Sequence, residues 1–247
     1  MKKLNSNHLK IIAIIAMTID HLADLLYPNM QNSIVPIVLH IIGRVTAPIM
    51  FFFICEGYHY TKNLKKYIAR LFIFAIISHF AYCFAFGINY IPFTTGSVFN
   101  QTSIMWSLAW AVVALYVANG NNQLKEYQKW ILVILINVIA FPADFSSIAV
   151  MSILTMYSNR GNLNKQMRSM MMWFSLYALI SFIFVNKTYG VISLFAILVY
   201  PLLKNYNGER GKAKWLKWFF YLYYPLHLII IGILRITIYD NVPILFN

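Results

Sequence analysis

Asp20, His21 and Asp24 lie close together within an otherwise apolar stretch, residues 9–27. That stretch is long enough to cross the ~30 Å hydrocarbon core of a bilayer as a helix. Ionisable side chains in hydrocarbon cost roughly 2.5–3.5 kcal/mol each on insertion scales, so they are rare unless the protein uses them. A histidine held by a carboxylate has a defined tautomer and can accept a proton from an amine or a hydroxyl. This run therefore predicts a buried polar site that performs proton transfer.

Ionisable residues in two other apolar stretches are expected at the same depth. A helix rise of ~1.5 Å per residue places Asp20 about 15 Å from the membrane surface, near the midplane. Arg44, whose helix enters from the opposite side, and His227, in the last stretch, reach a similar depth. Because an arginine offsets the charge of a buried carboxylate, we expect Arg44 to pair with Asp20 or Asp24. We expect Asp20, His21, Arg44 and His227 to form one catalytic pocket.

Two histidines are candidates for the general base, and the choice between them stays open at this point. His21 directly follows Asp20, whose carboxylate would orient the ring. His227 is flanked by tyrosines and lies at the matching depth. For His40 and His79, an interhelical hydrogen bond is the expected role.

The elements that must position these residues follow from the composition. The chain has 247 residues, of which 60% are hydrophobic, 17% aromatic and only 11% charged, which is typical of a polytopic membrane protein. We expect an all-α transmembrane helix bundle that forms one domain over residues 1–247, with about nine spans and a range of eight to ten. The fifth and sixth spans are short, and a re-entrant pair is the alternative to two crossings. The expected spans are 9–27, 34–60, 67–86, 103–119, 130–142, 144–157, 168–185, 188–203 and 216–239.

Basic residues are distributed unevenly between the two sides of this bundle. The net charge of +13 raises the question of nucleic-acid binding, but 17 of the 20 lysines and arginines fall on one face. This positive-inside asymmetry accounts for the charge and places the N-terminus in the cytoplasm. We therefore expect a multi-pass protein of the plasma membrane, such as a bacterial cytoplasmic membrane, whose partner is the lipid bilayer and not nucleic acid.

Motifs for other chemistries are missing from the sequence. There is no HExxH or CxxC spacing and no glycine-rich phosphate loop, so no metal site is predicted. There is also no Gly-x-Ser-x-Gly element that would indicate a serine nucleophile. Cys55 and Cys83 are expected near opposite ends of neighbouring spans, so no disulfide is predicted between them.

Several short elements occur in order from the first expected span to the last. They are Ile19-Asp-His-Leu, Gly43-Arg-Val-Thr-Ala-Pro, Glu56-Gly-Tyr-His-Tyr-Thr-Lys-Asn, Tyr67-x-x-Arg-Leu and Tyr224-Pro-Leu-His. Together they resemble the TraX family of integral-membrane proteins. The middle of the chain, about 87–215, matches more loosely, and Asp144 stands where the family tends to have an Asp-Tyr-Gly-like element. Taken by itself, Asp144 is expected to be an exposed turn residue at the outer edge.

This resemblance implies a membrane-embedded acetyltransferase. The implied donor is cytosolic acetyl-CoA. The implied acceptor is an amine, such as the N-terminus of a pilin or peptide, or a hydroxyl such as that of a glycan, at or beyond the outer face. The matching functional candidates are Asp20, His21, Arg44, Glu56 and His227. Residues expected to bind the donor are Glu56, Lys62, Lys65, Lys66, Arg70 and Tyr224.

Two other classes of function are compatible with the same residues. Buried Asp, His and Arg side chains also form the proton relays of transporters, so a proton-coupled transporter of a small molecule is the main alternative. Such folds often contain internal repeats, and none is evident here. A non-enzymatic assembly or immunity protein, in which the buried charges only stabilise the fold, is the third possibility. The acceptor and the oligomeric state are left open.

Overall fold

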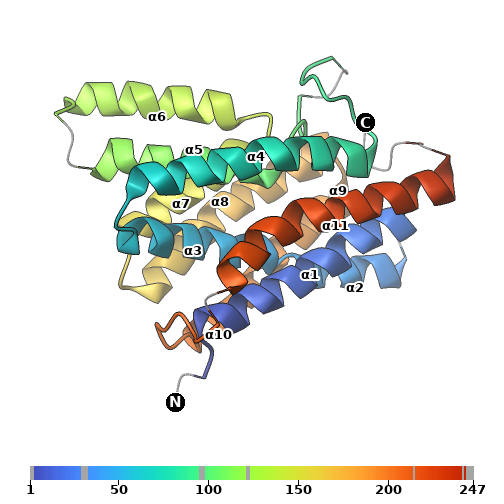
Figure 1. Ribbon diagram of the computed structural model, residues 1–247, viewed down its shortest axis with the longest axis horizontal. Helices are drawn as coiled ribbons and strands as arrows, with labels where there is room; N and C mark the ends of the chain where they lie inside the picture. Colours follow the sequence, from blue (N-terminus) through green and yellow to red (C-terminus); the bar gives the residue numbers. More distant parts are fainter. Residues whose placement is uncertain are drawn as a thin grey trace.

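The chain forms a bundle of long helices that lie roughly parallel and antiparallel to one another (Figure 1). The computed structural model describes residues 3–28, 33–94, 98–120, 123–213, 215–240 and 242. Within these ranges there is no β-strand, so the all-α prediction is confirmed. The helices are α1 (Ser6–Leu26), α2 (Ile34–Gly43), α3 (Thr46–Tyr60), α4 (Leu64–Phe86), α5 (Ile104–Asn119), α6 (Glu126–Ala140), α7 (Ser146–Ser158), α8 (Leu163–Phe184), α9 (Lys187–Ser193), the 3-10 helix η1 (Leu194–Leu198), α10 (Val199–Lys204) and α11 (Leu216–Tyr239).

Each of the nine expected spans corresponds to a helical segment in the described part of the chain. Five segments are both long and apolar enough to cross a membrane, and α5 and α7 are shorter apolar helices. The protein is therefore a membrane protein with transmembrane helices. The number of complete crossings and the side of the N-terminus remain predictions. The five long segments are 34–60, 64–86, 163–184, 187–204 and 216–239.

Two of the expected spans are less regular than predicted. The segment 34–60 is interrupted at Arg44 and Val45, so α2 ends at Gly43 and α3 begins at Thr46. Pro48 lies in the first turn of α3, where its missing N–H costs no helical bond because that N–H would have no partner inside the helix. The segment 187–204 contains the 3-10 turns of η1 in its middle.

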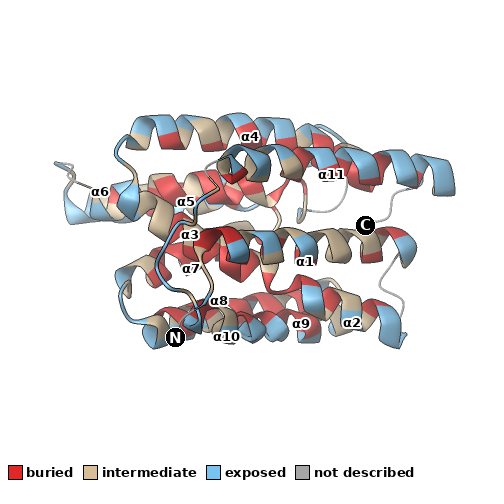
Figure 2. Ribbon diagram, turned by 60° about the horizontal axis from the view of Figure 1, so that its bottom comes forward, coloured by how far each residue is buried: buried red, intermediate tan, exposed pale blue. Residues whose placement is uncertain are grey.

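Burial is concentrated where the helices face one another, and the outward faces are exposed (Figure 2). Small side chains let the central helix α5 approach its neighbours, since Ala109, Ala111 and Ala114 are fully buried. The exposed residues include many large apolar ones, as on α6, where Ile134 is 60% and Val138 is 66% exposed. Exposed apolar faces of this kind are compatible with contact with lipid.

Helix α1 carries the ionisable run and is fixed to its neighbours by hydrogen bonds along its length. The Thr46 hydroxyl on α3 donates to the carbonyl of Ala13 at 3.1 Å. The hydroxyls of Thr18 and of Tyr223 on α11 lie 2.7 Å apart. The hydroxyl of Tyr239, at the end of α11, donates to the carbonyl of Leu25 at 2.9 Å. These bonds set the rotation of α1 about its axis, which decides where its ionisable side chains point.

A buried arginine also anchors α11 near its C-terminal end. Arg235 is only 2% exposed and lies near the C-terminal end of α4. Its guanidinium donates to the carbonyls of Phe84 and Ala85, at 3.1 and 3.0 Å. The last carbonyls of a helix have no partner inside it, so this side chain satisfies groups that would otherwise lose their hydrogen bonds.

Candidate active site

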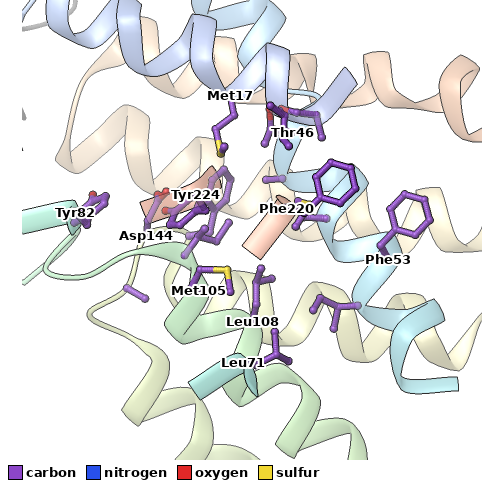
Figure 3. A pocket seen from close by; sticks show the side chains of 18 of the residues that line it. Met17, Thr46, Phe53, Leu71, Tyr82, Met105, Leu108, Asp144, Phe220 and Tyr224 are labelled. Carbon is purple, nitrogen blue, oxygen red and sulfur yellow. The ribbon is translucent and has the colours of Figure 1, made fainter. Parts of the chain in front are cut away.

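A long cavity runs beside α1 through the middle of the bundle. Its volume is about 660 Å³, and its wall includes α1 residues from Asn7 to Asp24, which is roughly 26 Å of helix. Apolar side chains such as Met105 and Leu108 line its middle, and Asp144 lies towards one end (Figure 3). The other end is bordered by the first turns of α1 and by the connections near it. The cavity therefore runs from the region of Asp144 to the region around the first turns of α1.

The buried ion pair that the sequence predicts is present. Arg44 Nη2 lies 2.9 Å from Asp20 Oδ1 and 2.7 Å from Asp20 Oδ2, and the Arg44 side chain is 5% exposed. Arg44 Nε also donates to the carbonyl of His40 at 3.2 Å, which holds the guanidinium at the break between α2 and α3. Gly43 leaves room for the carboxylate, because a Cβ there would come within 2.4 Å of Asp20. Both Asp20 and Arg44 line the cavity.

His40 extends this charge network to the second carboxylate of α1. Its Nδ1 donates to Asp20 Oδ1 at 2.8 Å, because a carboxylate only accepts. Its Nε2 faces Asp24 Oδ1 at 3.8 Å and has no hydrogen-bond partner among the described residues. The predicted interhelical hydrogen bond of His40 is thus observed, and the partner is Asp20.

The two candidate bases are in direct contact. His227 Nδ1 lies 3.0 Å from the carbonyl oxygen of Tyr223, which can only accept, so this nitrogen carries the proton. His227 Nε2 must then accept, and it does so from His21 Nδ1 at 2.9 Å. His21 Nε2 is left as the basic nitrogen of the pair. Since His21 lines the cavity and His227 does not, His21 is the histidine of the pair that borders the cavity.

The residues predicted to bind the donor divide into two groups. Lys62, Arg70 and Tyr224 line the cavity. Lys65 and Lys66 are exposed and lie outside its wall.

Glu56 also lies outside the wall, in an ion pair with a residue of the α7–α8 connection. Its carboxylate accepts from Arg160 Nε at 2.8 Å and from Nη2 at 3.2 Å. Partial burial alone would lower the pKa of Arg160, but the hydrogen bond and charge of Glu56, together with Tyr60, outweigh it and raise that pKa. The Glu56 side chain therefore joins α3 to that connection and does not face the cavity.

Five basic residues surround one end of the cavity, three more than sequence reasoning identified. The additional residues are Lys10, Arg210 and Lys217, which the sequence pattern attributes only to membrane topology. Aromatic rings lie under Lys10, Arg70 and Lys217, with Lys10 Nζ 4.9 Å from the centre of the Phe53 ring. Arg70 Nε is buried with no hydrogen-bond partner in the described part of the chain. Lys10, Lys62, Arg70, Arg210 and Lys217 form what we call the basic mouth.

The prediction that Asp144 is an exposed turn residue is wrong. It is only partly exposed and lines the cavity. Its backbone N–H donates to the carbonyl of Thr102 at 2.9 Å, and the N–H of Gln101 donates to the carbonyl of Pro142 at 2.8 Å. These bonds hold the α6–α7 connection against the segment before α5, which turns Asp144 inwards. Sequence spacing carries no signal of such a contact between two connections.

The connection between α4 and α5 borders the end of the cavity opposite the basic mouth. Phe99 and Asn100 lie in the cavity wall. His79 on α4 holds this connection, since its Nε2 donates to the carbonyl of Tyr90 at 2.8 Å and its Nδ1 lies 2.9 Å from the Thr102 hydroxyl. His79 thus makes hydrogen bonds as predicted, although its partners lie in a connection and not in a helix. Cys55 and Cys83 are buried free thiols.

Taken together, the apolar helices and the enclosed ionisable residues define an integral-membrane protein with a polar chamber inside its helix bundle. The family model described as TraX protein matches residues 5–235, so the chain belongs to the TraX family and the resemblance read from the sequence is confirmed.

Two curated proteins resemble this chain to different extents. It is 28% identical over 230 residues to the probable fimbrial assembly protein FimC, serogroup H1, of Dichelobacter nodosus, covering 89% of this chain and 91% of that protein. It is also 38% identical over 69 residues to an uncharacterized protein of Rickettsia prowazekii (strain Madrid E), covering 28% of this chain and 23% of that one. No solved structure matches the chain.

Proposed function

We propose that this protein is a membrane acetyltransferase that moves an acetyl group from cytosolic acetyl-CoA to an amine at or beyond the outer face of the plasma membrane. The family and the fimbrial assembly relative support a role linked to pilins, so the N-terminus of a pilin or another peptide is the acceptor that we favour. The observation that carries the proposal is one cavity whose wall includes both the basic mouth and His21, the histidine whose Nε2 is the basic nitrogen of the pair.

The basic mouth suits the donor. Coenzyme A carries several phosphate charges, and the described residues at this end of the cavity wall include five cations and no carboxylate. Hydrogen bonds from Arg and Lys to phosphate are charge-assisted and strong, and Arg70 Nε has no partner in the described chain. The pantetheine arm then lies along the apolar middle of the cavity, past Met105 and Leu108. In this arrangement the mouth faces the cytoplasm, in agreement with the predicted topology.

In the proposed reaction His21 is the general base. Its Nε2 takes a proton from the acceptor nitrogen as that nitrogen attacks the thioester carbonyl and forms the new N–C bond. Collapse of the intermediate restores the C=O bond and breaks the C–S bond, and His21 returns the proton to the leaving thiolate. His227 is a positioning residue, because its bond to His21 Nδ1 fixes the tautomer. Arg44 and Asp20 hold the surroundings of His21 through their ion pair.

The charges in the part of the cavity around His21, away from the basic mouth, favour an amine over a hydroxyl. Asp20, Asp24 and Asp144 all line the cavity, and Arg44 is the only arginine or lysine among the described residues of that region. Arg44 is already paired with Asp20. An arriving ammonium group would compensate the remaining carboxylates, and one of them would take its extra proton before attack. A neutral hydroxyl would leave that charge unbalanced.

A direct test follows labelled acetyl groups. Membranes containing the protein are incubated with acetyl-CoA labelled in the acetyl group, together with a pilin or a peptide with a free N-terminal amine. We expect covalent label on the acceptor amine, detected by mass spectrometry, and none when the amine is already blocked. Uptake of a solute without a labelled acceptor would support the proton-coupled transporter. If neither label nor uptake is detected, the non-enzymatic assembly protein is supported.

The basic mouth gives a second prediction, which concerns the donor. Arg70→Gln is expected to raise the KM for acetyl-CoA at least tenfold, because a charged hydrogen bond contributes about 1.5–3 kcal/mol. The matched control is Lys65→Gln on the same helix, which removes the same charge from an exposed residue outside the cavity wall. Its KM is expected to stay within twofold. Equal KM changes in the two variants would exclude the mouth as the donor site.

A further inference from the structure

The proposed reaction needs a hydrogen-bond donor to the thioester oxygen. When the amine attacks, the thioester oxygen becomes an oxyanion, and donors placed for that charge contribute about 10²–10³-fold to the rate in other enzymes. His21 handles protons only, and the Nη2 group of Arg44 is engaged by Asp20. A hydroxyl or amide donor in the cavity wall near Arg44 would be placed to supply this hydrogen bond.

Two tyrosines from different helices meet beside Arg44. Arg44 Nη1 donates to the hydroxyl oxygen of Tyr189 on α9 at 3.1 Å, and its guanidinium carbon lies 5.0 Å from the centre of that ring. The hydroxyl of Tyr177 on α8 lies 3.4 Å from that of Tyr189. Both tyrosines line the cavity, as do Asp20 and His21. The pair thus lies in the same chamber as the base, next to a fixed positive charge.

Local structure holds both rings in place. The side chain of Asn186 accepts from the N–H of Tyr189 at 3.1 Å and caps α9, so Tyr189 lies in the first turn of that helix. Gly190 lets α9 pack closely on α8, since a Cβ there would lie 2.7 Å from the carbonyl of Ala178. The ring of Tyr177 stacks on Phe145, with centroids 4.8 Å apart. Donors that are rigidly held before the reaction are the ones that stabilise a transition state most.

We propose that the hydroxyl of Tyr189, supported by Tyr177, donates a hydrogen bond to the thioester oxygen as it becomes an oxyanion. The inference rests on the proposed acetyl transfer. Tyr189 accepts from the cationic Arg44, and a hydroxyl that accepts such a bond becomes a stronger donor through its own rotatable O–H. Tyr189 keeps its proton throughout, so the balance of the reaction is unchanged. In this assignment Arg44 acts indirectly, because it donates to Tyr189 and pairs with Asp20. Tyr189 is the catalytic residue that contacts the reacting oxygen.

Tyr189→Phe tests this assignment, because it keeps the ring under Arg44 and removes only the hydroxyl. We expect kcat to fall about 10²-fold with the KM for acetyl-CoA unchanged, since an interaction made only in the transition state affects kcat. Tyr177→Phe is expected to lower kcat by a smaller factor. The matched control is Tyr200→Phe, whose hydroxyl donates to Asn164 away from the cavity, and it should retain full activity.

The possible outcomes separate the two proposals. Absence of acetyl transfer by the unmodified protein would overturn the proposed function itself. Transfer by the unmodified protein, with kcat of Tyr189→Phe within twofold of it, would overturn the role of Tyr189 alone. So would a raised KM with normal kcat, which indicates a role in binding the ground state. If Tyr189→Phe fails to fold, as judged by its elution in detergent, Tyr177→Phe decides, and an unchanged kcat there contradicts the inference.

Discussion

Replacing His21 with alanine is expected to lower kcat for acetyl transfer by about 10²–10⁴-fold, the usual contribution of a general base. The loss follows from the hydrogen-bond chain that leaves His21 Nε2 as the only basic nitrogen of the histidine pair, on a residue that lines the cavity. Binding of acetyl-CoA should be unaffected, because the basic mouth lies at the other end of the cavity. Single-turnover transfer of labelled acetyl groups and donor binding in detergent measure the two quantities separately.

Substitution of His227 distinguishes this mechanism from one in which His227 is the general base and His21 positions it. His227→Ala is expected to lower kcat less than His21→Ala, since it removes the partner that fixes the tautomer and leaves the base in place. His59→Ala is the control, because this exposed residue does not line the cavity. The roles of His21 and His227 would be exchanged if His227→Ala abolished transfer while His21→Ala kept more than a tenth of it.

Asp20→Asn is expected to destabilise the fold by about 3–5 kcal/mol, the cost of leaving one partner of a buried ion pair uncompensated. The substitution preserves the size of the side chain, but the guanidinium of Arg44, 5% exposed, then has no counter-charge within hydrogen-bond distance among the described residues. His40 also loses the carboxylate to which its Nδ1 donates. Equilibrium unfolding of the purified protein in mixed micelles measures the change in free energy.

An exposed ion pair provides the comparison. Glu126→Gln breaks the pair with Lys129 on α6, where Glu126 is 79% exposed, and should cost less than about 1 kcal/mol. Removing both members of the buried pair, in Asp20→Asn with Arg44→Gln, should restore part of the lost stability because no single charge is then left buried. Equal costs for Asp20→Asn and Glu126→Gln would show that the Asp20–Arg44 pair is solvated in the membrane protein.

The expected effects of His21→Ala and Asp20→Asn concern neighbouring residues of the same site. The ion pair joins α1 to the break between α2 and α3, and His21 is the next residue along α1. The rotation of α1 that brings Asp20 to Arg44 also brings His21 to His227 on α11. A variant that loosens the pair is therefore expected to lose activity as well as stability, whereas His21→Ala should lose activity alone.

Much of the fold could be predicted from the sequence because a membrane imposes simple rules. The runs of apolar residues set where helices lie, and the last segment, 216–239, has the predicted bounds. The residue count along each helix also sets depth, so Asp20, Arg44 and His227 could be placed at one level before any contact was known. Electrostatics then predicted the pair of Asp20 with Arg44, since neither charge is tolerable alone in hydrocarbon.

The tertiary structure decided what depth cannot determine, namely the direction in which each side chain points. Lys65 and Arg70 belong to the same helix, yet only Arg70 faces the cavity, and His21 faces it while His227 lies behind. The contribution of Asp144 depends on a contact between two connections, and that of Tyr189 on how closely α9 packs on α8. Depth follows from the rise per residue, which is a property of one helix. The rotation of a helix about its axis follows from packing against all its neighbours, which no single stretch of sequence contains.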